Sequence, residues 1–221
     1  FWDAKQGLYR DGEGCDHASF HANMFPLAFG LVPADKNPAV IAYLKSRGMV
    51  CSVYGAQYLL DALFENCEAD YAIGLLNATN ERSWRHMLEL GSTMTTEALD
   101  PKFKPNLTWN HALGAAAGNC IARHVMGIQP AAPGFTRINV RPQPGKLASA
   151  SLRMPTPKGD VTVAFENGKR FSLNLDVPAG TKADVTLPRK GRVTLDGRAA
   201  VTQTGLIVSD LGPGHHVINV E

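Results

Sequence analysis

The residue whose type and surroundings are best suited to chemistry is Glu97, which follows a run of small and hydroxyl residues from Gly91 to Thr96. A carboxylate between two helical stretches can point into a cavity while Ser and Thr side chains orient it. Hydrolysis of a glycosidic bond uses two carboxylates, one as acid and the other as base or nucleophile. Glu97 supplies only half of that pair, so catalysis is one interpretation. The other is a Glu that stabilises the start of the following helix.

A second group of functional side chains follows at residues 106–114, where another helix is expected to begin. Trp109, Asn110 and His111 bring an aromatic ring, an amide and an imidazole together. Such side chains commonly bind sugars, because rings stack on the apolar face of a sugar and polar groups bond its hydroxyls. The alternative is an Asn-capped helix whose Trp109 and His111 pack in the core. The residues alone leave both interpretations open.

The sequence predicts neither a metal site nor a cofactor. No two cysteines form the C-x-x-C pair typical of a structural zinc site, so we expect free thiols. His215 and His216 have no third ligand near them in the sequence and are expected at the surface. The four cysteines are Cys15, Cys51, Cys67 and Cys120.

The composition is that of a globular protein, with 44% hydrophobic and 19% charged residues among 221. The formal net charge of +2, without a stripe of Lys and Arg, argues against nucleic-acid binding. No apolar stretch reaches the roughly 18–20 residues of a membrane helix. The chain starts Phe1-Trp2-Asp3, with neither a Met nor a signal-peptide pattern, so we expect a piece of a longer polypeptide.

Residues 1 to about 128 show the hydrophobic spacing of helices. Asp16 is the expected cap of the first helix, and Gly30 is its expected C-terminal stop. The last helix is expected to be the longest, and its many Ala and Gly residues allow a neighbouring backbone to approach closely. Helices are predicted over 16–29, 38–46, 54–64, 68–76, 83–90 and 109–126.

The pattern changes after residues 129–134, a stretch containing Pro and Gly that is expected to be a linker. Beyond it, apolar and polar residues alternate in short segments separated by turn residues, which indicates an antiparallel β-sandwich. Asn167-Gly168 and Asp196-Gly197 are the expected hairpin turns. Strands are predicted over 136–140, 160–165, 171–177 and 216–220.

About six helices in three pairs correspond to half of a toroid of six hairpins. In an independent domain, the face that should meet the other half would stay exposed as an apolar patch. A second copy or a missing segment could cover that face, and we favour the missing segment. The predicted fold class is α+β and multidomain, with a half barrel at 1–128 and an antiparallel sandwich at 129–221.

Several blocks of the chain, in their order, are similar to one family of glycosidases. Together they cover most of the chain, and it is their combination that makes the match specific. In these blocks the chain resembles the bacterial α-L-rhamnosidases of glycoside hydrolase family 78. The blocks are Ser19–Asn23 leading to Phe29–Pro33, Ser83–Leu88, Gly91–Glu97, Asn110-His111 and the passage from Gly127 to Pro142.

The resemblance implies half of an (α/α)6 barrel and an inverting reaction. In that family the Glu of the Thr-Thr block is the general base, so Glu97 would activate a water against the anomeric carbon. The His of the Asn-His block contacts the sugar, so His111 would bond a rhamnose hydroxyl. Trp84 and His21 match as substrate-binding residues by position only. The alternatives are a hydrophobic anchor for Trp84 and a carbonyl-bonded helix residue for His21.

Two features depart from the family pattern. The family's general acid lies in an upstream block rich in Asp and Glu that we do not find here. Asp11, Glu13 and Asp16 form a small acidic cluster, but it suits a solvated loop better. Leu99 and Leu113 stand where relatives often carry an aromatic residue, which leaves the sugar specificity open.

The resulting hypothesis is the C-terminal portion of an inverting α-L-rhamnosidase, which removes terminal α-L-rhamnose from glycosides and is incomplete on its own. Its partners would be a rhamnose-containing carbohydrate or glycoside and either the missing N-terminal part of the same enzyme or a second subunit. A non-catalytic carbohydrate-binding fragment and another (α/α)6 glycosidase are the alternatives, because one fold hosts several chemistries. The compartment, bacterial cytoplasm or periplasm, stays open.

Overall fold

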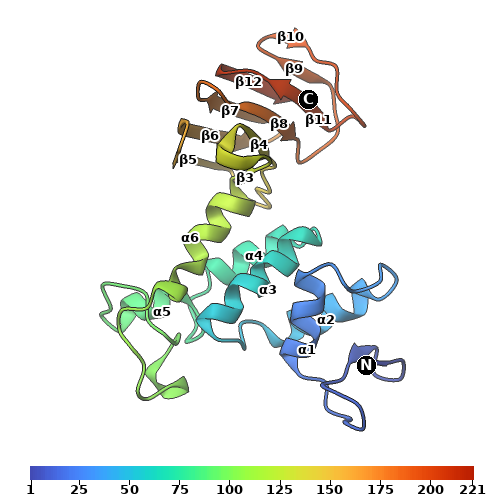
Figure 1. Cartoon of the computed structure of the whole chain (residues 1–221), viewed down its shortest axis with the longest axis vertical. Coiled ribbons are helices and arrows are strands. Elements are labelled where there is room, and N and C mark those ends of the chain that lie inside the picture. The colour runs from blue at the N-terminus through green and yellow to red at the C-terminus, as the bar shows by residue number, and fades with distance from the viewer. The chain divides into compact units, whose positions relative to one another are not determined.

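A computed structural model describes all residues, 1–221, and the chain forms two compact units (Figure 1). The first unit comprises Phe1–Cys120 and the second Ile121–Glu221. Helices dominate the first unit and strands the second, so the predicted order of an α part followed by a β part is confirmed. The predicted domain boundary between residues 128 and 129 stays a prediction. None of the helices has both the length and the apolar character that a membrane span requires.

The first unit contains six helices and a two-stranded hairpin. The hairpin pairs β1 (Trp2–Asp3) with β2 (Leu8–Tyr9). A 3₁₀ turn, Pro101–Phe103, follows α5, and another, Ala112–Ala115, leads directly into α6. The helices are α1 (Phe20–Ala28), α2 (Asn37–Arg47), α3 (Val53–Glu65), α4 (Ala69–Leu76), α5 (Trp84–Glu89) and α6 (Ala116–Cys120).

Serine side chains start three of these helices. Ser19 caps α1 by accepting a hydrogen bond from the backbone N–H of Ala22. Ser52 and Ser83 cap α3 and α5 in the same way, which satisfies N–H groups that the first turn leaves without partners. The expected cap at Asp16 was therefore wrong, because α1 starts one turn later. Residues 11–18 form a loop instead.

Helix α3 is the centre of the first unit and packs against α1, α4 and α6. Leu59, Leu60, Leu63 and Phe64 on this helix are completely buried. Burying one such side chain contributes roughly 1.5–3 kcal/mol, so this helix supplies much of the unit's hydrophobic stabilisation. Helix α6 and the 3₁₀ turn that leads into it are thus fixed to a packed core.

The helix predicted over 109–126 was wrong in extent and in regularity. Residues 109–111 are not helical, and the stretch from Ala112 begins as a 3₁₀ turn before α6. The longest helix is α3, with 13 residues. The cause is a tertiary contact: Gly114 lies against Thr95, and a Cβ at Gly114 would be 2.6 Å from the Thr95 Cβ. The backbone N–H of His111 also donates to the Thr95 carbonyl, so it is not used in a helical turn, and the loop before Glu97 packs directly on Gly114.

The second unit begins with a π-helical turn, Ile121–Val125, and continues as two sheets. The six-stranded sheet has the order β10-β9-β12-β7-β6-β5, and the four-stranded sheet has the order β11-β8-β4-β3. The strands are β3 (Ile128–Pro130), β4 (Arg137–Val140), β5 (Ser149–Thr156), β6 (Gly159–Asn167), β7 (Phe171–Val177), β8 (Lys182–Thr186), β9 (Val193–Leu195), β10 (Arg198–Ala199), β11 (Ile207–Leu211) and β12 (Gly214–Val220).

Two details of the second unit differ from the prediction. The expected linker at 129–134 holds most of β3 and the start of a 3₁₀ turn, Pro133–Phe135, because β3 pairs with β4. The strands are antiparallel except for β4 and β8, which pair in parallel. The six-stranded sheet is antiparallel throughout, as expected.

Alternation along the strands builds the core of the second unit. In β7, Phe171, Leu173 and Leu175 are completely buried while the residues between them are not. The predicted hairpin turn at Asp196-Gly197 joins β9 to β10, and both residues have positive φ angles, 50° and 79°. Those angles are typical of a two-residue type I′ turn, which explains the Asp-Gly sequence.

Candidate active site

Glu97 and His111 lie on two loop segments that hydrogen bonds tie together. The backbone N–H of Glu97 donates to the Thr108 carbonyl at 3.0 Å, and that of His111 donates to the Thr95 carbonyl at 2.8 Å. The Thr95 hydroxyl in turn donates to the His111 carbonyl at 2.8 Å. The structure therefore brings together the two residues that the sequence selected for base and sugar contact.

The carboxylate of Glu97 has three hydrogen-bond donors around it. Lys104 Nζ lies 2.5 Å from Oε1, and the backbone N–H of Thr108 donates to Oε2 at 3.0 Å. The Thr108 hydroxyl lies 3.3 Å from the same Oε2. The side chain of Glu97 is 23% exposed. A carboxylate that accepts several hydrogen bonds is held in one orientation, which is what a group that positions a water needs.

The same donors set the charge of Glu97. The hydrogen bond from Lys104, followed by the one from the Thr108 backbone, lowers the pKa of Glu97 to about 2, against an opposing effect of burial. Glu97 is therefore ionised at every pH near neutrality, which a general base must be. Its proton affinity is also low, and general bases are most efficient when their pKa lies near the working pH. Lys104 thus limits the basicity of Glu97.

His111 is linked to Glu97 through Thr108. The Nδ1 atom of His111 lies 3.3 Å from the Thr108 hydroxyl, the same hydroxyl that contacts the Glu97 carboxylate. His111 is partly exposed, as a residue that contacts a soluble ligand has to be. Its position is therefore compatible with the predicted sugar contact, and that contact stays a prediction.

Trp84 anchors the loop in front of α6. Its indole N–H donates to the carbonyl of Gly114 at 2.7 Å, so the polar edge of its ring is already used inside the protein. This bond holds α5 to the segment that follows His111. The structure gives Trp84 a positioning contact, and its predicted contact with substrate is not tested.

His21 lies apart from the other predicted site residues. It is exposed on α1, and its ring contacts Phe20 and Phe25. No hydrogen bond, ion pair or ring contact joins it to Glu97 or His111. The structure therefore does not bring His21 to this site, although its predicted role in substrate binding is untested.

The sequence analysis missed Lys104 and Thr108, which are the direct partners of Glu97. It also missed His86, whose Nε2 lies 2.6 Å from an Asp100 carboxylate oxygen, and Asp100 caps the 3₁₀ turn that precedes Lys104. The bond from the Lys102 backbone, and then His86, lowers the pKa of Asp100. Asp100-Pro101 was a readable cap signal. The pairing of Lys104 with Glu97 had no such signal, because it follows from the path of an irregular loop.

A cavity of about 260 Å³ opens beside Glu97. Arg82 and Lys104 supply positive charge to it, and the Arg82 guanidinium stacks on Phe103 at 3.8 Å from the ring centroid. The lining residues come from the segment that leads into α3, from the segment before α5 and from the loop around Glu97. They are Val50, Cys51, Ser52, Arg82, Glu97, Ala98, Leu99, Phe103 and Lys104.

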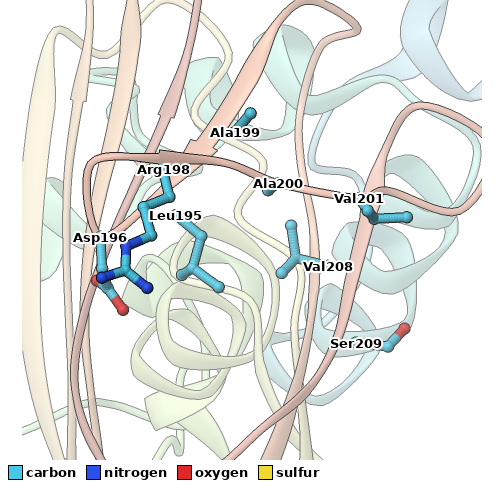
Figure 2. Close-up of a pocket in the computed structure, with 8 residues that line it drawn as sticks. All are labelled: Leu195, Asp196, Arg198, Ala199, Ala200, Val201, Val208 and Ser209. Carbon is cyan, nitrogen blue, oxygen red and sulfur yellow. The ribbon is translucent and has the colours of Figure 1, made fainter.

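A larger cavity, about 520 Å³, lies in the second unit between the β9–β10 hairpin and β11 (Figure 2). Its ionisable lining residues are Asp196 and Arg198. Asp196 already accepts a hydrogen bond from the Val217 backbone and lies 3.3 Å from His216. The remaining lining is mostly small and aliphatic, so this cavity lacks a pair of groups suited to acid–base chemistry. The site around Glu97 is the better candidate.

Two family models match the chain. The bacterial α-L-rhamnosidase 6 hairpin glycosidase domain matches residues 1–125, and the bacterial α-L-rhamnosidase C-terminal domain matches residues 127–201. An α-L-rhamnosidase of Streptomyces avermitilis is 26% identical over 211 residues, which are 90% of this chain and 20% of that protein. An α-L-rhamnosidase of Formosa agariphila is 28% identical over 145 residues, 61% of this chain and 15% of that protein. The chain thus spans about a fifth or less of these relatives.

Solved structures show the same fold. The α-L-rhamnosidase from Dictyoglumus thermophilum superimposes with a TM-score of 0.83 at 23% identity, covering 97% of this chain and 26% of that one. The Streptomyces avermitilis α-L-rhamnosidase complexed with L-rhamnose gives a TM-score of 0.77 at 24% identity, covering 97% of this chain and 22% of that one. The predicted fold class, part of a six-hairpin barrel followed by a β domain, is confirmed.

Proposed function

The chain belongs to the bacterial α-L-rhamnosidase family, and we propose that it carries the general-base side of the active site of an inverting enzyme that removes terminal α-L-rhamnose from glycosides. The observation that supports this most directly is the pairing of the Glu97 segment, which lines a cavity, with the His111 segment. The pairing joins an ionised carboxylate and an imidazole through hydrogen bonds within the first unit. That arrangement suits a base that directs water and a side chain that bonds a sugar hydroxyl.

Glu97 would act on the water that attacks the anomeric carbon. The water oxygen bonds to that carbon as the glycosidic bond breaks, and the proton of the water passes to Glu97. A separate carboxylic acid protonates the leaving oxygen. In inverting enzymes the carboxyl groups of acid and base are about 6.5–9.5 Å apart. Oε2 already accepts two hydrogen bonds from Thr108, whereas Oε1 accepts one from Lys104. Oε1 is therefore the carboxylate oxygen that can accept a hydrogen bond from the water.

We assign the general acid to the missing N-terminal part of the same enzyme or to a second subunit. The first unit has an exposed aromatic face that such a partner would cover. Phe29 is 60% exposed and Tyr54 49%, and the two rings contact Tyr58 at centroid distances of 5.6 and 5.4 Å. A contiguous exposed apolar patch of this kind is typical of a protein interface. Further hairpins packed on this face would complete the barrel.

A panel of p-nitrophenyl glycosides tests this proposal. Nitrophenol leaves readily without protonation, so the assay reports on Glu97 and the sugar site even where the acid is absent. We expect release from the α-L-rhamnoside and from no other sugar, by the chain alone or joined to its proposed N-terminal part. Glu97→Gln should lower the rate of nitrophenol release by about 10²–10⁴-fold.

The matched control is Glu166→Gln, which makes the same change at an exposed residue of the second unit. It should leave the rate of release unchanged. Equal rates in wild type and Glu97→Gln would contradict the assignment of the base. Release from a different sugar would support another glycosidase of the same architecture, and binding of rhamnose without release by the joined protein would support a non-catalytic fragment.

A further inference from the structure

Thr108 has one hydroxyl proton and two partners for it. The oxygen Oγ1 lies 3.3 Å from Glu97 Oε2 and 3.3 Å from His111 Nδ1. A hydroxyl can donate one hydrogen bond and accept two. The direction of each bond therefore depends on which partner has no hydrogen of its own.

Glu97 is the partner that can only accept. Its carboxylate is ionised, since Lys104 and the Thr108 backbone hold its pKa at about 2. An ionised carboxylate has no proton to donate, and hydrogen bonds to charged acceptors are roughly twice as strong as neutral ones. The hydroxyl proton of Thr108 therefore points to Oε2. The opposite choice would leave two oxygens facing each other without a hydrogen between them.

The hydrogen bond between Thr108 and His111 then has only one possible direction. Once the Thr108 proton is committed to Glu97, His111 can bond to Oγ1 only by donating from Nδ1–H. In a neutral imidazole, a proton on Nδ1 leaves Nε2 as an acceptor. The bond that one ring nitrogen makes thus decides what the other nitrogen presents.

We propose that Thr108 is a positioning residue that holds neutral His111 in its Nδ1–H form, so that Nε2 accepts a hydrogen bond from a substrate hydroxyl. The part concerning substrate rests on the proposed function, whereas the protonation form of His111 does not. Glu97, Thr108 and His111 then form one chain of hydrogen bonds. The base and the sugar-binding residue are oriented by the same hydroxyl.

The test is ¹⁵N NMR of the imidazole rings in the whole chain at a pH of about 8, where an ordinary His is neutral. His111→Gln identifies the His111 signals among those of the seven histidines. We expect Nδ1 to show the shift of a protonated nitrogen and Nε2 that of an unprotonated one. Thr108→Val removes the hydroxyl while keeping the side-chain shape and the backbone bond to Glu97, and it should move His111 toward the Nε2–H form. Thr108→Ser should restore the wild-type form.

The NMR spectra either support or overturn the proposed role of Thr108. A wild-type His111 protonated on Nε2, or a His111 that Thr108→Val leaves unchanged, would overturn the proposal. Backbone amide spectra of the Thr108 variants that superimpose on wild type outside residues 95–111 exclude loss of fold as the cause. Adding L-rhamnose to the same sample separates the two claims. A shift of the Nε2 signal supports the sugar contact. No shift, either here or in the chain joined to its proposed N-terminal part, counts against the proposed function and leaves the role of Thr108 standing on the first result.

Discussion

The Lys104 ammonium lies 2.5 Å from Oε1 of Glu97, seven residues earlier in the chain. This contact helps to orient the candidate base and is the largest cause of its lowered pKa. The two effects act against each other in catalysis, because a well-positioned carboxylate with low proton affinity is a weak base. Changing Lys104 should therefore alter both the orientation and the basicity of Glu97.

Replacing Lys104 with Met should raise the pKa of Glu97 from about 2 toward the ordinary value of 4.5. Glu97 must be ionised to act, so the acid limb of kcat/KM against pH should move to higher pH in this variant. Below pH 4 the variant should lose activity while the wild type keeps it. The pH profile of nitrophenyl rhamnoside hydrolysis measures this.

Lys104→Arg is the matched control, since it keeps the positive charge and should keep the acid limb near its wild-type position. If the acid limb of the kcat/KM profile lies at the same pH in Lys104→Met as in wild type, a group other than Glu97 determines that limb.

Gly114 is predicted to be required for the shape of the site. A Cβ at this position would lie 2.6 Å from Thr95 Cβ and 2.8 Å from the Thr96 carbonyl, so Gly114→Ala must displace the loop that carries Glu97. Crowding of this kind costs about 1–3 kcal/mol of stability. Urea unfolding of the variant measures the loss, and nitrophenyl release should fall as well.

Gly118→Ala is the control in α6, because a Cβ there would have no atom within 4 Å. It should match or slightly exceed wild-type stability, since Ala favours a helix over Gly by about 1 kcal/mol. Equal stability losses at the two glycines would contradict the contact between Gly114 and the loop.

The exposed aromatic face predicts a measurable interface. Phe29→Ser with Tyr54→Ser should weaken assembly of this chain with its proposed N-terminal part, because both side chains are about half exposed or more in the chain alone. Analytical ultracentrifugation of the mixed parts measures the association. The double variant should keep its own fold, since neither side chain is buried in the first unit.

Val201→Ser tests whether the effect is specific, because Val201 is 96% exposed but belongs to the second unit. If this control weakens assembly as much as the double variant, the aromatic face is not the interface.

Asp184 and Arg137 predict a pH-dependent contribution to the second unit. The two make a bidentate ion pair with N–O distances of 2.7 and 2.8 Å, and the Arg137 bond lowers the pKa of Asp184. A carboxylate whose pKa is lowered on folding stabilises the fold above its unfolded pKa. That contribution is lost as the pH falls through the folded value.

Asp184→Asn should therefore reduce the free energy of unfolding at pH 7 by about 1 kcal/mol, a value reduced for solvent screening. Near pH 2 the difference from wild type should shrink. Urea unfolding at both pH values measures it, and a difference that does not depend on pH would contradict the ionic origin.

Patterns local in sequence predicted the fold well. The strand over 171–177 and the Asp196-Gly197 turn are as expected, because burial on one face and positive φ angles leave signals in neighbouring residues. The parallel pairing of β4 with β8 and the broken helix after His111 depend on contacts far apart in the chain. No local pattern reports such contacts.

The candidate site was predictable only in part. Glu97 and His111 could be selected from their neighbours and from a resemblance, and the structure places them together. Lys104 and Thr108 could not be selected, because their roles arise from the path of an irregular loop. His21 was selected by position alone, and the structure leaves it on α1 without a contact to Glu97.

The central claim is that Glu97 is the general base, and azide rescue of Glu97→Ala tests it most directly. The variant lacks the base that activates water. Azide needs no such base, because the anion itself attacks the anomeric carbon as nitrophenolate leaves. With p-nitrophenyl α-L-rhamnoside, measured in the chain joined to its proposed N-terminal part, we expect little release without azide. Azide should restore release and give the rhamnosyl azide of inverted configuration. Undiminished release by Glu97→Ala without azide, or a product of retained configuration, would contradict the account.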